Sequence, residues 1–330
     1  MLALSTRSVG PETPDEFGPD TLESCGQCTT FPFLMRMHAT AQPPEPLPVY
    51  AGRPFSLRNH SWTQIWSYRR VTAANVKEGI KVVAAGDVSN QNWEGGNDMC
   101  SAYGLLGRAD ARRQASILGA WRGGLRTEAF ATAEARAYGW FQFLQQSAAP
   151  AFAQNMSLVR DEAAIGTRLG LTKAPYVRDS RRAIGLDGFR LFYANMSAPA
   201  VPGGVTAAKF ADAVGIGEYF YADVHRLDAD VCTVPAYLTG SRPVVPFYLP
   251  FRALTVAARP NLLVAGKTMA QSFQAAAATR VHPVEWASGA AAGVSAALMA
   301  AEQWSSADAL REVARVRERV ARQAPVDWTL

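Results

Sequence analysis

A glycine and a proline in the last quarter of the chain mark the place where the sequence is best suited to hold a ligand. Residues 261–265 (NLLVA) form a short apolar run typical of a buried strand, and Gly266 follows directly. A glycine lets the backbone approach a ligand closely because it has no side chain. Pro283 fits the first turn of a helix whose free N–H groups and positive dipole would face a ligand. In that helix, Gly289 and Gly293 permit close packing on a strand or a ligand, and plain helix–sheet packing explains them as well.

Two of the four cysteines form a second candidate for chemistry. Cys25 and Cys28 have the C-x-x-C spacing that serves both dithiol redox reactions and metal ligation. A tetracysteine metal site needs two further thiolates, and Cys100 and Cys232 are single residues far apart. The pattern favours a loop disulfide or two ordinary thiols, and we predict no metal site. Whether the pair is redox-active stays open, because spacing does not place it near a cofactor.

Composition excludes several classes of protein. With 48% hydrophobic and 18% charged residues, the 330-residue chain is typical of a folded globular protein. The net charge of +5 comes from scattered Lys and Arg residues without a basic run among aromatics, so we predict no nucleic-acid partner. Residues 288–301 are Ala- and Gly-rich but shorter than the roughly 20 apolar residues of a membrane span, which favours a buried helix. The first twenty residues lack an export signal, so a cytoplasmic location is expected. Abundant Arg and Ala are typical of a GC-rich, most often bacterial, genome.

The hydrophobic pattern predicts an α+β organisation. The first part of the chain has an irregular lead-in with one short strand at residues 2–4, then alternates strand-like runs with polar loops. Strands are predicted at residues 30–39, 64–71, 80–85, 176–178, 189–194, 217–224, 244–249 and 261–265. Helices are predicted at residues 109–147, broken at Gly123-Gly124, and at 269–279, 283–302 and 305–323. An apolar stripe in the first helix is interpreted as core: Phe130, Ala133, Ala137, Phe141 and Leu144.

Three segments near the C-terminal end follow one another in a specific order: PFRAL at residues 250–254, NLLVAGK at 261–267 and TRVHPVEWASGAAAG at 279–293. This order resembles the C-terminal signature of the FAD-dependent oxidoreductase family related to the FAD subunit of heterodisulfide reductase. That family carries a Pro-Tyr-Arg-like segment, a strand ending in Ala-Gly-Arg, and an Arg-Val-x-Pro turn into a Gly-Ala-Ala-Gly helix. Further similar segments lie upstream in the same order: SYRRV at 67–71, NWEGGND at 92–98, YVRDSRRAIG at 176–185 and IGEYFYADVH at 216–225.

The resemblance implies FAD as cofactor, a small-molecule substrate and two groups of site residues. The cofactor-binding group contains Arg252, Gly266, Lys267, Arg280, His282, Pro283 and Gly289. The catalytic group belongs to the substrate side: Arg178, Arg181, Arg182 and His225. Here the arginines face the isoalloxazine or hold an anionic substrate, and the imidazole acts as base during hydride removal. A salt-bridged strand edge explains the arginines as well, whereas His38 and His60 have no comparable setting.

The same resemblance implies a partial two-dinucleotide-binding flavoprotein fold, described as α+β with α/β character. It consists of a mixed β-sheet substrate domain and a C-terminal strand–helix segment of the FAD domain. The expected boundaries are a lead-in at 1–29, the substrate-side domain at 30–243, the FAD-domain segment at 244–304, and an amphipathic helix with tail at 305–330.

The chain departs from the family at the phosphate-binding loop. No G-x-G-x-x-G stands between a first strand and helix; GIGEYF at residue 215 and GAAAG at residue 289 fail on spacing or context. We therefore expect an N-terminally truncated or split enzyme, with another chain supplying the missing FAD-binding part. An exposed apolar sheet would then favour aggregation or association. The alternative is a non-catalytic binding or assembly subunit that kept the fold and lost the cofactor.

Overall fold

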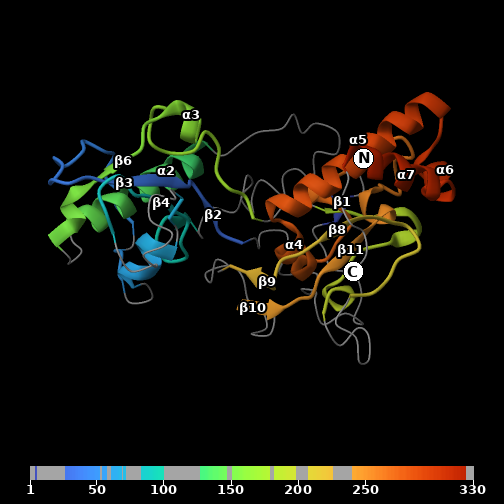
Figure 1. Cartoon of the computed structure of the whole chain (residues 1–330), viewed down its shortest axis with the longest axis horizontal. Helices are drawn as coiled ribbons and strands as arrows, with labels where there is room; N and C mark the ends of the chain where they lie inside the picture. The colour runs from blue at the N-terminus through green and yellow to red at the C-terminus, as the bar shows by residue number, and fades with distance from the viewer. Residues whose placement is uncertain are drawn as a thin grey trace. The chain divides into compact units, whose positions relative to one another are not determined.

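The computed structural model describes residues 4–5, 27–52, 54–57, 61–68, 70–71, 83–99, 127–146, 151–178, 182–197, 207–225 and 240–324. These residues belong to two compact units (Figure 1). The middle unit is Cys28–Val177, and the terminal unit joins Met1–Gln27 to Arg178–Leu330. The domains predicted from the sequence (1–29, 30–243, 244–304 and 305–330) have other boundaries than these two units, and they remain a prediction.

The middle unit contains a small antiparallel sheet and one long helix. Its elements are β2 (Thr29–Thr30), β3 (Phe33–Met37), η1 (Thr63–Tyr68), β4 (Val88–Gln91), β5 (Asp98–Met99), α2 (Thr127–Gln146), η3 (Ala151–Asn155), β6 (Met156–Leu158) and α3 (Glu162–Ile165). Strand β3 lies between β4 and β6, and β2 pairs with β5. Every second residue of β3 is buried, as expected for a strand with one face on the core.

Helix α2 confirms the predicted apolar stripe. Ala133, Ala137, Phe141 and Leu144 are buried in the core of the middle unit, and Phe130 packs against it. The ring of Phe141 meets Phe33 of β3 edge to face, with ring centroids 6.1 Å apart. The helical spacing of the stripe therefore correctly predicted both the helix and the side that it buries. The other half of the predicted helix, residues 109–126, lies outside the described residues.

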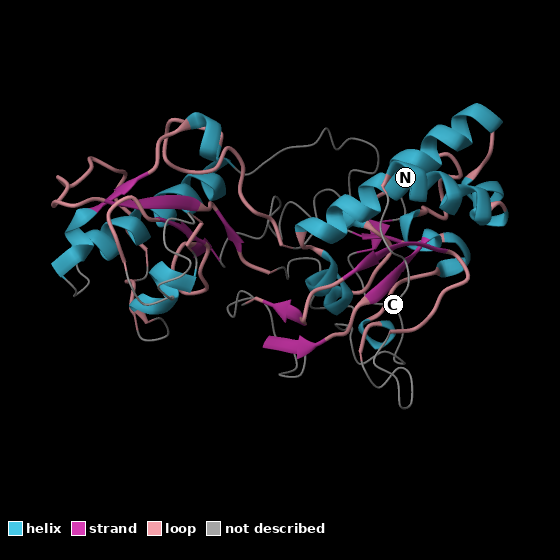
Figure 2. Cartoon of the chain, in the orientation of Figure 1, coloured by secondary structure: helices cyan, strands magenta, loops and turns pink. Residues whose placement is uncertain are grey.

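The terminal unit combines short strand pairs with the C-terminal helices (Figure 2). Its elements are β1 (Leu4–Ser5), β7 (Arg182–Ala183), η4 (Leu186–Gly188), η5 (Tyr193–Asn195), β8 (Ala213–Gly217), β9 (Tyr221–Val224), β10 (Gly240–Pro243), β11 (Phe247–Pro250), η8 (Phe251–Leu254), η9 (Gly266–Thr268), α4 (Phe273–Thr279), α5 (His282–Glu302), α6 (Ser306–Arg311) and α7 (Val313–Gln323). Strands β1 and β7, β8 and β11, and β9 and β10 form antiparallel pairs.

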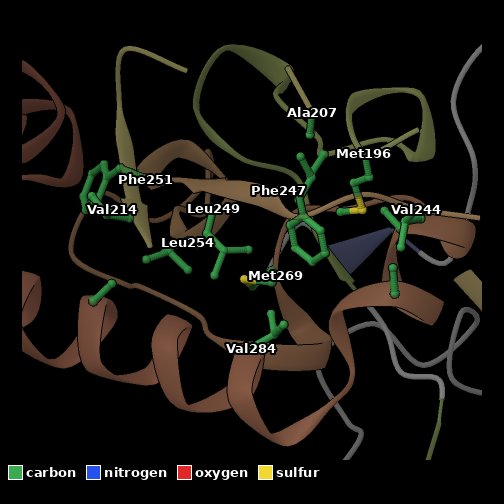
Figure 3. Packing of buried hydrophobic residues seen from close by; sticks show 14 of the residues in the cluster. Met196, Ala207, Val214, Val244, Phe247, Leu249, Phe251, Leu254, Met269 and Val284 are labelled. Carbon is green, nitrogen blue, oxygen red and sulfur yellow. The ribbon is translucent and has the colours of Figure 1, made fainter. Parts of the chain in front are cut away.

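Two glycines let helix α5 pack closely on strand β8. A side chain at Gly217 would collide with Phe247 and with Val284 of α5, and one at Gly215 would contact Leu249 and Ala287. Phe247, Met269 and Val284 belong to the core that these elements share (Figure 3). The Gly-containing run that fails as a phosphate loop is therefore a packing surface, and it sets where the N-terminal end of α5 lies.

Helix α5 is 21 residues long, and its length and composition would allow it to cross a membrane. The predicted helix at 283–302 is confirmed, and the Ala- and Gly-rich run at 288–301 forms only part of it. One face is buried against the unit and carries Val284, Ser288, Ala291, Ser295 and Met299, whereas Trp286 is 58% exposed. Core helices of globular proteins pass the same length and composition test, so the test gives only weak evidence for a span.

Several predicted strands are wrong. Residues 64–68 of the predicted strand 64–71 belong to the helical turn η1, in which Ile65 and Trp66 are fully buried. The carbonyl of Ile65 accepts hydrogen bonds from Ser89 and Gln91, so tertiary contacts override the strand propensity of this segment. Residues 189–194 and 261–265 form only the isolated bridges of Leu191 with Gln271 and of Leu263 with Thr255.

The loop expected after residue 85 contains β4 and β5, which were missed. Their polar residues conceal the strand pattern, since Ser89, Gln91 and Asp98 are buried here. Strand 217–224 is two strands, β8 and β9, with a turn between them. The last predicted helix is divided into α6 and α7, and its predicted cap is confirmed: Ser305 and Asp308 form a capping box.

Candidate functional site

A carboxylate and an imidazole lie side by side at the end of strand β9. Asp223 and His225 are two residues apart, which places them on the same face of an extended chain. Nε2 of His225 lies 3.1 Å from Oδ2 of Asp223. The backbone N–H of His225 donates to Oε1 of Gln27 at 3.0 Å, so the main chain at the imidazole is held as well. Both side chains remain partly exposed.

Arg280 reaches the same carboxylate from helix α4. This residue caps the C-terminal end of α4, and its side chain is only 5% exposed. Its Nη2 donates to the backbone oxygen of Asp223 at 2.8 Å and lies 3.6 Å from Oδ2 of the carboxylate. The structure therefore brings together Arg280, predicted at the cofactor, and His225, predicted on the substrate side.

Hydrogen bonds and positive charge stabilise the ionised form of Asp223. The hydrogen bond from His225, together with that imidazole's charge, the Ser241 hydroxyl and the Arg280 guanidinium, holds the pKa of Asp223 well below its usual range, although burial acts in the opposite direction. Ser241 Oγ donates to Oδ1 of Asp223 at 2.7 Å from the neighbouring strand β10. The cluster of Asp223, His225, Ser241 and Arg280, which we call the β9 cluster, is thus centred on a charged carboxylate.

A further arginine stands on strand β10, opposite Ala222. The guanidinium of Arg242 lies over the ring of Tyr193, 4.1 Å from its centroid, and Nη1 donates to Oε1 of Gln274 at 2.7 Å. The Tyr193 hydroxyl in turn donates to the backbone oxygen of Pro243 at 2.7 Å. The Tyr193 ring and Gln274 therefore fix the position of the Arg242 side chain, on the strand next to β9.

Gly266 begins the turn η9 in a left-handed conformation with φ 61°. Its N–H donates to the Ser288 hydroxyl at 3.0 Å, and its carbonyl accepts from the N–H of Met269 at 3.0 Å and from Gln271 Nε2 at 3.2 Å. A side chain on Gly266 would collide with the carboxylate of Glu285. The polar groups of this glycine are thus bonded within the protein, and Glu285 lies where a ligand was expected to approach.

Glu285 stands in the first turn of α5 and faces the turn η9. Its carboxylate accepts the backbone N–H of Lys267, and Oε1 lies 4.0 Å from Lys267 Nζ. Burial raises the pKa of Glu285, and the nearby Lys267 and His282 only partly offset that effect. Among the described residues, no donor forms a hydrogen bond to the buried Oε1. We call Gly266, Lys267, Glu285 and Ser288 the α5 mouth.

The remaining predicted cofactor residues differ in exposure. His282 and Pro283 are exposed at the start of α5, and Gly289 has open space where a side chain would point. Arg252 is held by protein groups: its Nε lies 3.0 Å from Oδ2 of Asp212, and its guanidinium covers the ring of Phe189. The position of Arg252 thus has a structural explanation within the terminal unit.

The arginines predicted on the substrate side are only partly visible. Arg178 is fully buried, and Arg182 belongs to β7, where its backbone pairs with Ser5. Arg181 lies outside the described residues. A shared site of these arginines and His225 therefore stays a prediction. Cys28 is buried and disulfide-bonded, whereas Cys25, Cys100 and Cys232 lie outside the described residues.

Sequence reasoning missed the carboxylates at the centres of both clusters. The alternation of Asp223 and His225 in a strand was a usable signal, because it puts both on one face. For Glu285, the signal was its place in the first turn after Pro283, where an acid is favoured by the helix dipole. Within the described ranges, no group of three or more His, Cys, Asp or Glu side chains is arranged to hold a metal ion.

Comparison with known proteins supports the resemblance noted in the sequence. The family model described as FAD dependent oxidoreductase matches residues 18–320. No curated protein and no solved structure matches the chain significantly. The match spans most of the chain and includes both the β9 cluster and the α5 mouth, whereas a specific relation to heterodisulfide reductase is not shown. The chain belongs to the family of FAD-dependent oxidoreductases.

Proposed function

We propose that this protein is an oxidoreductase that removes a hydride from a small organic substrate with FAD as the acceptor, and that His225 takes up the accompanying proton. The observation that carries the catalytic part is the β9 cluster, in which a carboxylate orients an imidazole. Membership of the family supports the cofactor. When bound, FAD supplies the acceptor for a hydride from a substrate C–H bond.

The described residues fit the ring end of such a cofactor at the α5 mouth. Glu285 Oε1 is a buried acceptor for which the described residues provide no donor, and Lys267 places an ammonium 4.0 Å away. The N-terminal end of α5 adds the positive end of the helix dipole, although Pro283 has no N–H and the N–H groups of Val284 and Glu285 donate to the Val281 carbonyl. Gly266 contributes by making room for Glu285, rather than through its own N–H or carbonyl.

His225 is suited to act as a base because its orientation is fixed. When Nε2–H donates to Asp223, the neutral ring carries its basic lone pair on Nδ1. The Asp223 carboxylate, 3.1 Å from Nε2, would hold the ring in place while Nδ1 takes up the proton. An imidazole can exchange a proton near neutral pH, which matches removal of an O–H or N–H proton from the substrate. We propose Arg178, Arg181 and Arg182 as the groups that hold an anionic substrate.

The proposal includes the partial two-dinucleotide-binding arrangement, in which a strand–helix segment of the FAD domain is retained near the end of the chain. No G-x-G-x-x-G loop for the FAD pyrophosphate occurs in the sequence. We therefore propose that the enzyme is truncated or split, and that another polypeptide completes FAD binding. Exposed Trp286, with open space beside Gly289 and Gly293, supports a helix surface available for such a contact. A cytoplasmic location stays a prediction.

A second candidate function is a non-catalytic binding or assembly subunit. The observation that favours it is the internal bonding at Gly266, where Ser288, Met269 and Gln271 satisfy the backbone without any ligand. In that case the residues of the α5 mouth only pack, and the protein needs no flavin.

Titration of the purified chain with FAD separates the two functions. A flavoprotein quenches or shifts the flavin signal near 450 nm and saturates at about one FAD per chain. The expected affinity is modest, because the pyrophosphate lacks its usual loop. A folded, colourless protein that leaves FAD unaffected at millimolar concentration would contradict flavin binding at the α5 mouth of this chain and support the second candidate.

A further inference from the structure

Glu285 is a carboxylate with one satisfied side and one unsatisfied side. It accepts the backbone N–H of Lys267, yet its buried Oε1 receives no hydrogen bond from the described residues. A place in the first turn of α5 explains the presence of an acid through the helix dipole. It does not explain why a buried carboxylate oxygen remains without a donor, since leaving such an atom unsatisfied costs free energy.

A donor and an acceptor stand next to each other at this point. Lys267 Nζ carries hydrogen-bond donors, and 4.0 Å away Glu285 Oε1 can accept. A ligand that offers a carbonyl oxygen next to an N–H, as in a cyclic amide or imide, satisfies both groups at once. A phosphate or a carboxylate offers acceptors only, so it would be repelled by Glu285.

We infer that Glu285 and Lys267 form a binding site for the imide edge of a planar heterocycle, with Glu285 Oε1 accepting the imide N–H and Lys267 donating to the adjacent carbonyl. This inference rests on the proposed function, because the pyrimidine edge of the flavin ring is such an imide. It assigns ring recognition to the Glu285 side chain, which the sequence did not single out. Gly266 serves the same site indirectly, since any side chain there would displace Glu285.

The test compares riboflavin with 3-methylriboflavin, in which a methyl group replaces the imide N–H. Both lack the pyrophosphate, so the missing Gly-rich loop does not affect the result. Dissociation constants are measured by fluorescence quenching for the wild type and for Glu285→Ala, Glu285→Gln and Lys267→Met. Glu318→Ala is the matched control, because Glu318 is an exposed acid on α7 that pairs with Arg322. Circular dichroism shows that each variant is folded.

The wild type is expected to bind riboflavin about tenfold or more tightly than 3-methylriboflavin, the value of a hydrogen bond to a charged acceptor. Glu285→Ala should remove this discrimination, and Glu285→Gln, which keeps an acceptor oxygen without the charge, should retain part of it. Lys267→Met should weaken both ligands by a similar factor, whereas Glu318→Ala should change neither.

Equal binding of the two ligands by the wild type overturns the inference and leaves the proposed function standing. Discrimination that survives in Glu285→Ala overturns it as well, because another acceptor must then hold the N–H. Failure of the wild type to bind FAD or riboflavin at all overturns the proposed function, and this inference with it.

Discussion

The β9 cluster and the α5 mouth each contain a carboxylate with a basic side chain beside it. The two carboxylates differ in their hydrogen bonds and in the direction of their pKa shifts. Asp223 accepts from His225 and Ser241 and lies against Arg280. Glu285 accepts one backbone N–H and keeps a buried oxygen without a donor among the described residues. The pKa of Asp223 is accordingly lowered, and that of Glu285 is raised.

This difference suggests different roles. A carboxylate whose oxygens are bonded to protein groups is held in place and can orient a neighbour, which is what a base such as His225 requires. A carboxylate that is partly desolvated and left with an open lone pair is poorly satisfied until a ligand donates to it. Both oxygens of Asp223 are therefore bonded to protein groups without a ligand, whereas Oε1 of Glu285 is not.

The largest expected effect is the loss of Arg280. Arg280→Met removes the buried cation from Asp223 and should lower the free energy of unfolding by about 3 kcal/mol, as for other broken buried ion pairs. Urea denaturation at pH 7 measures this value. Arg319→Met, an exposed arginine on α7, is the control and should change stability by less than about 0.5 kcal/mol. A loss no larger than that of the control would mean that the β9 cluster is not tightly coupled.

A smaller but still clear effect is expected from Gly266→Ala. The left-handed backbone at φ 61° disfavours alanine, and the new side chain would collide with the Glu285 carboxylate. Together these should cost about 2 kcal/mol of unfolding free energy. Gly289→Ala is the matched control: it lies inside α5 with open space, so it should gain up to about 1 kcal/mol in thermal or urea unfolding. If both variants change the free energy of unfolding in the same direction, the position of the Glu285 side chain does not require a glycine at residue 266.

The pH dependence of the stability of Asp223→Asn tests whether the charge on Asp223 stabilises the fold. Because the pKa of Asp223 is lower in the folded protein, its charge stabilises the fold above its ordinary pKa, and this stability is lost as the pH falls toward the folded value. At pH 7 the free energy of unfolding of the wild type should exceed that of Asp223→Asn by about 1 to 2 kcal/mol. The difference should shrink once the pH falls below about 4. A pH-independent difference would contradict the role of the charge.

Much of the C-terminal part could be predicted from sequence, because its signals are local. Pro283 in the first turn of α5, the cap at Ser305 and the buried positions Val316 and Val320 are set by neighbours a few residues away. The same holds for the stripe of α2. In these helices, periodicity and capping determine both the element and its buried side.

The rest depended on contacts between residues far apart in the chain. Ile65 and Trp66 look like strand residues, yet the bonds of Ser89 and Gln91 to the Ile65 carbonyl help to hold a helical turn. Arg280 could be selected as a site residue, but its partner Asp223 lies 57 positions earlier. Likewise, the sequence indicated that Gly266 needs room, and only the structure shows that Glu285 fills it.

The smallest expected effect decides whether the two carboxylates really differ. Burial raises the pKa of Glu285 above its ordinary value of 4.5, so the charged form is disfavoured in the fold at neutral pH and the penalty disappears as the pH falls below that value. Glu285→Gln should therefore be slightly more stable than the wild type at pH 7, by less than about 1 kcal/mol because the side chain is partly exposed to solvent. Near pH 4 the two proteins should unfold at similar urea concentrations. The sign is thus opposite to that of Asp223→Asn at pH 7, and both differences shrink in acid. If Glu285→Gln instead loses stability at pH 7, Glu285 has a stabilising partner like Asp223, and its carboxylate is not held ready for a ligand.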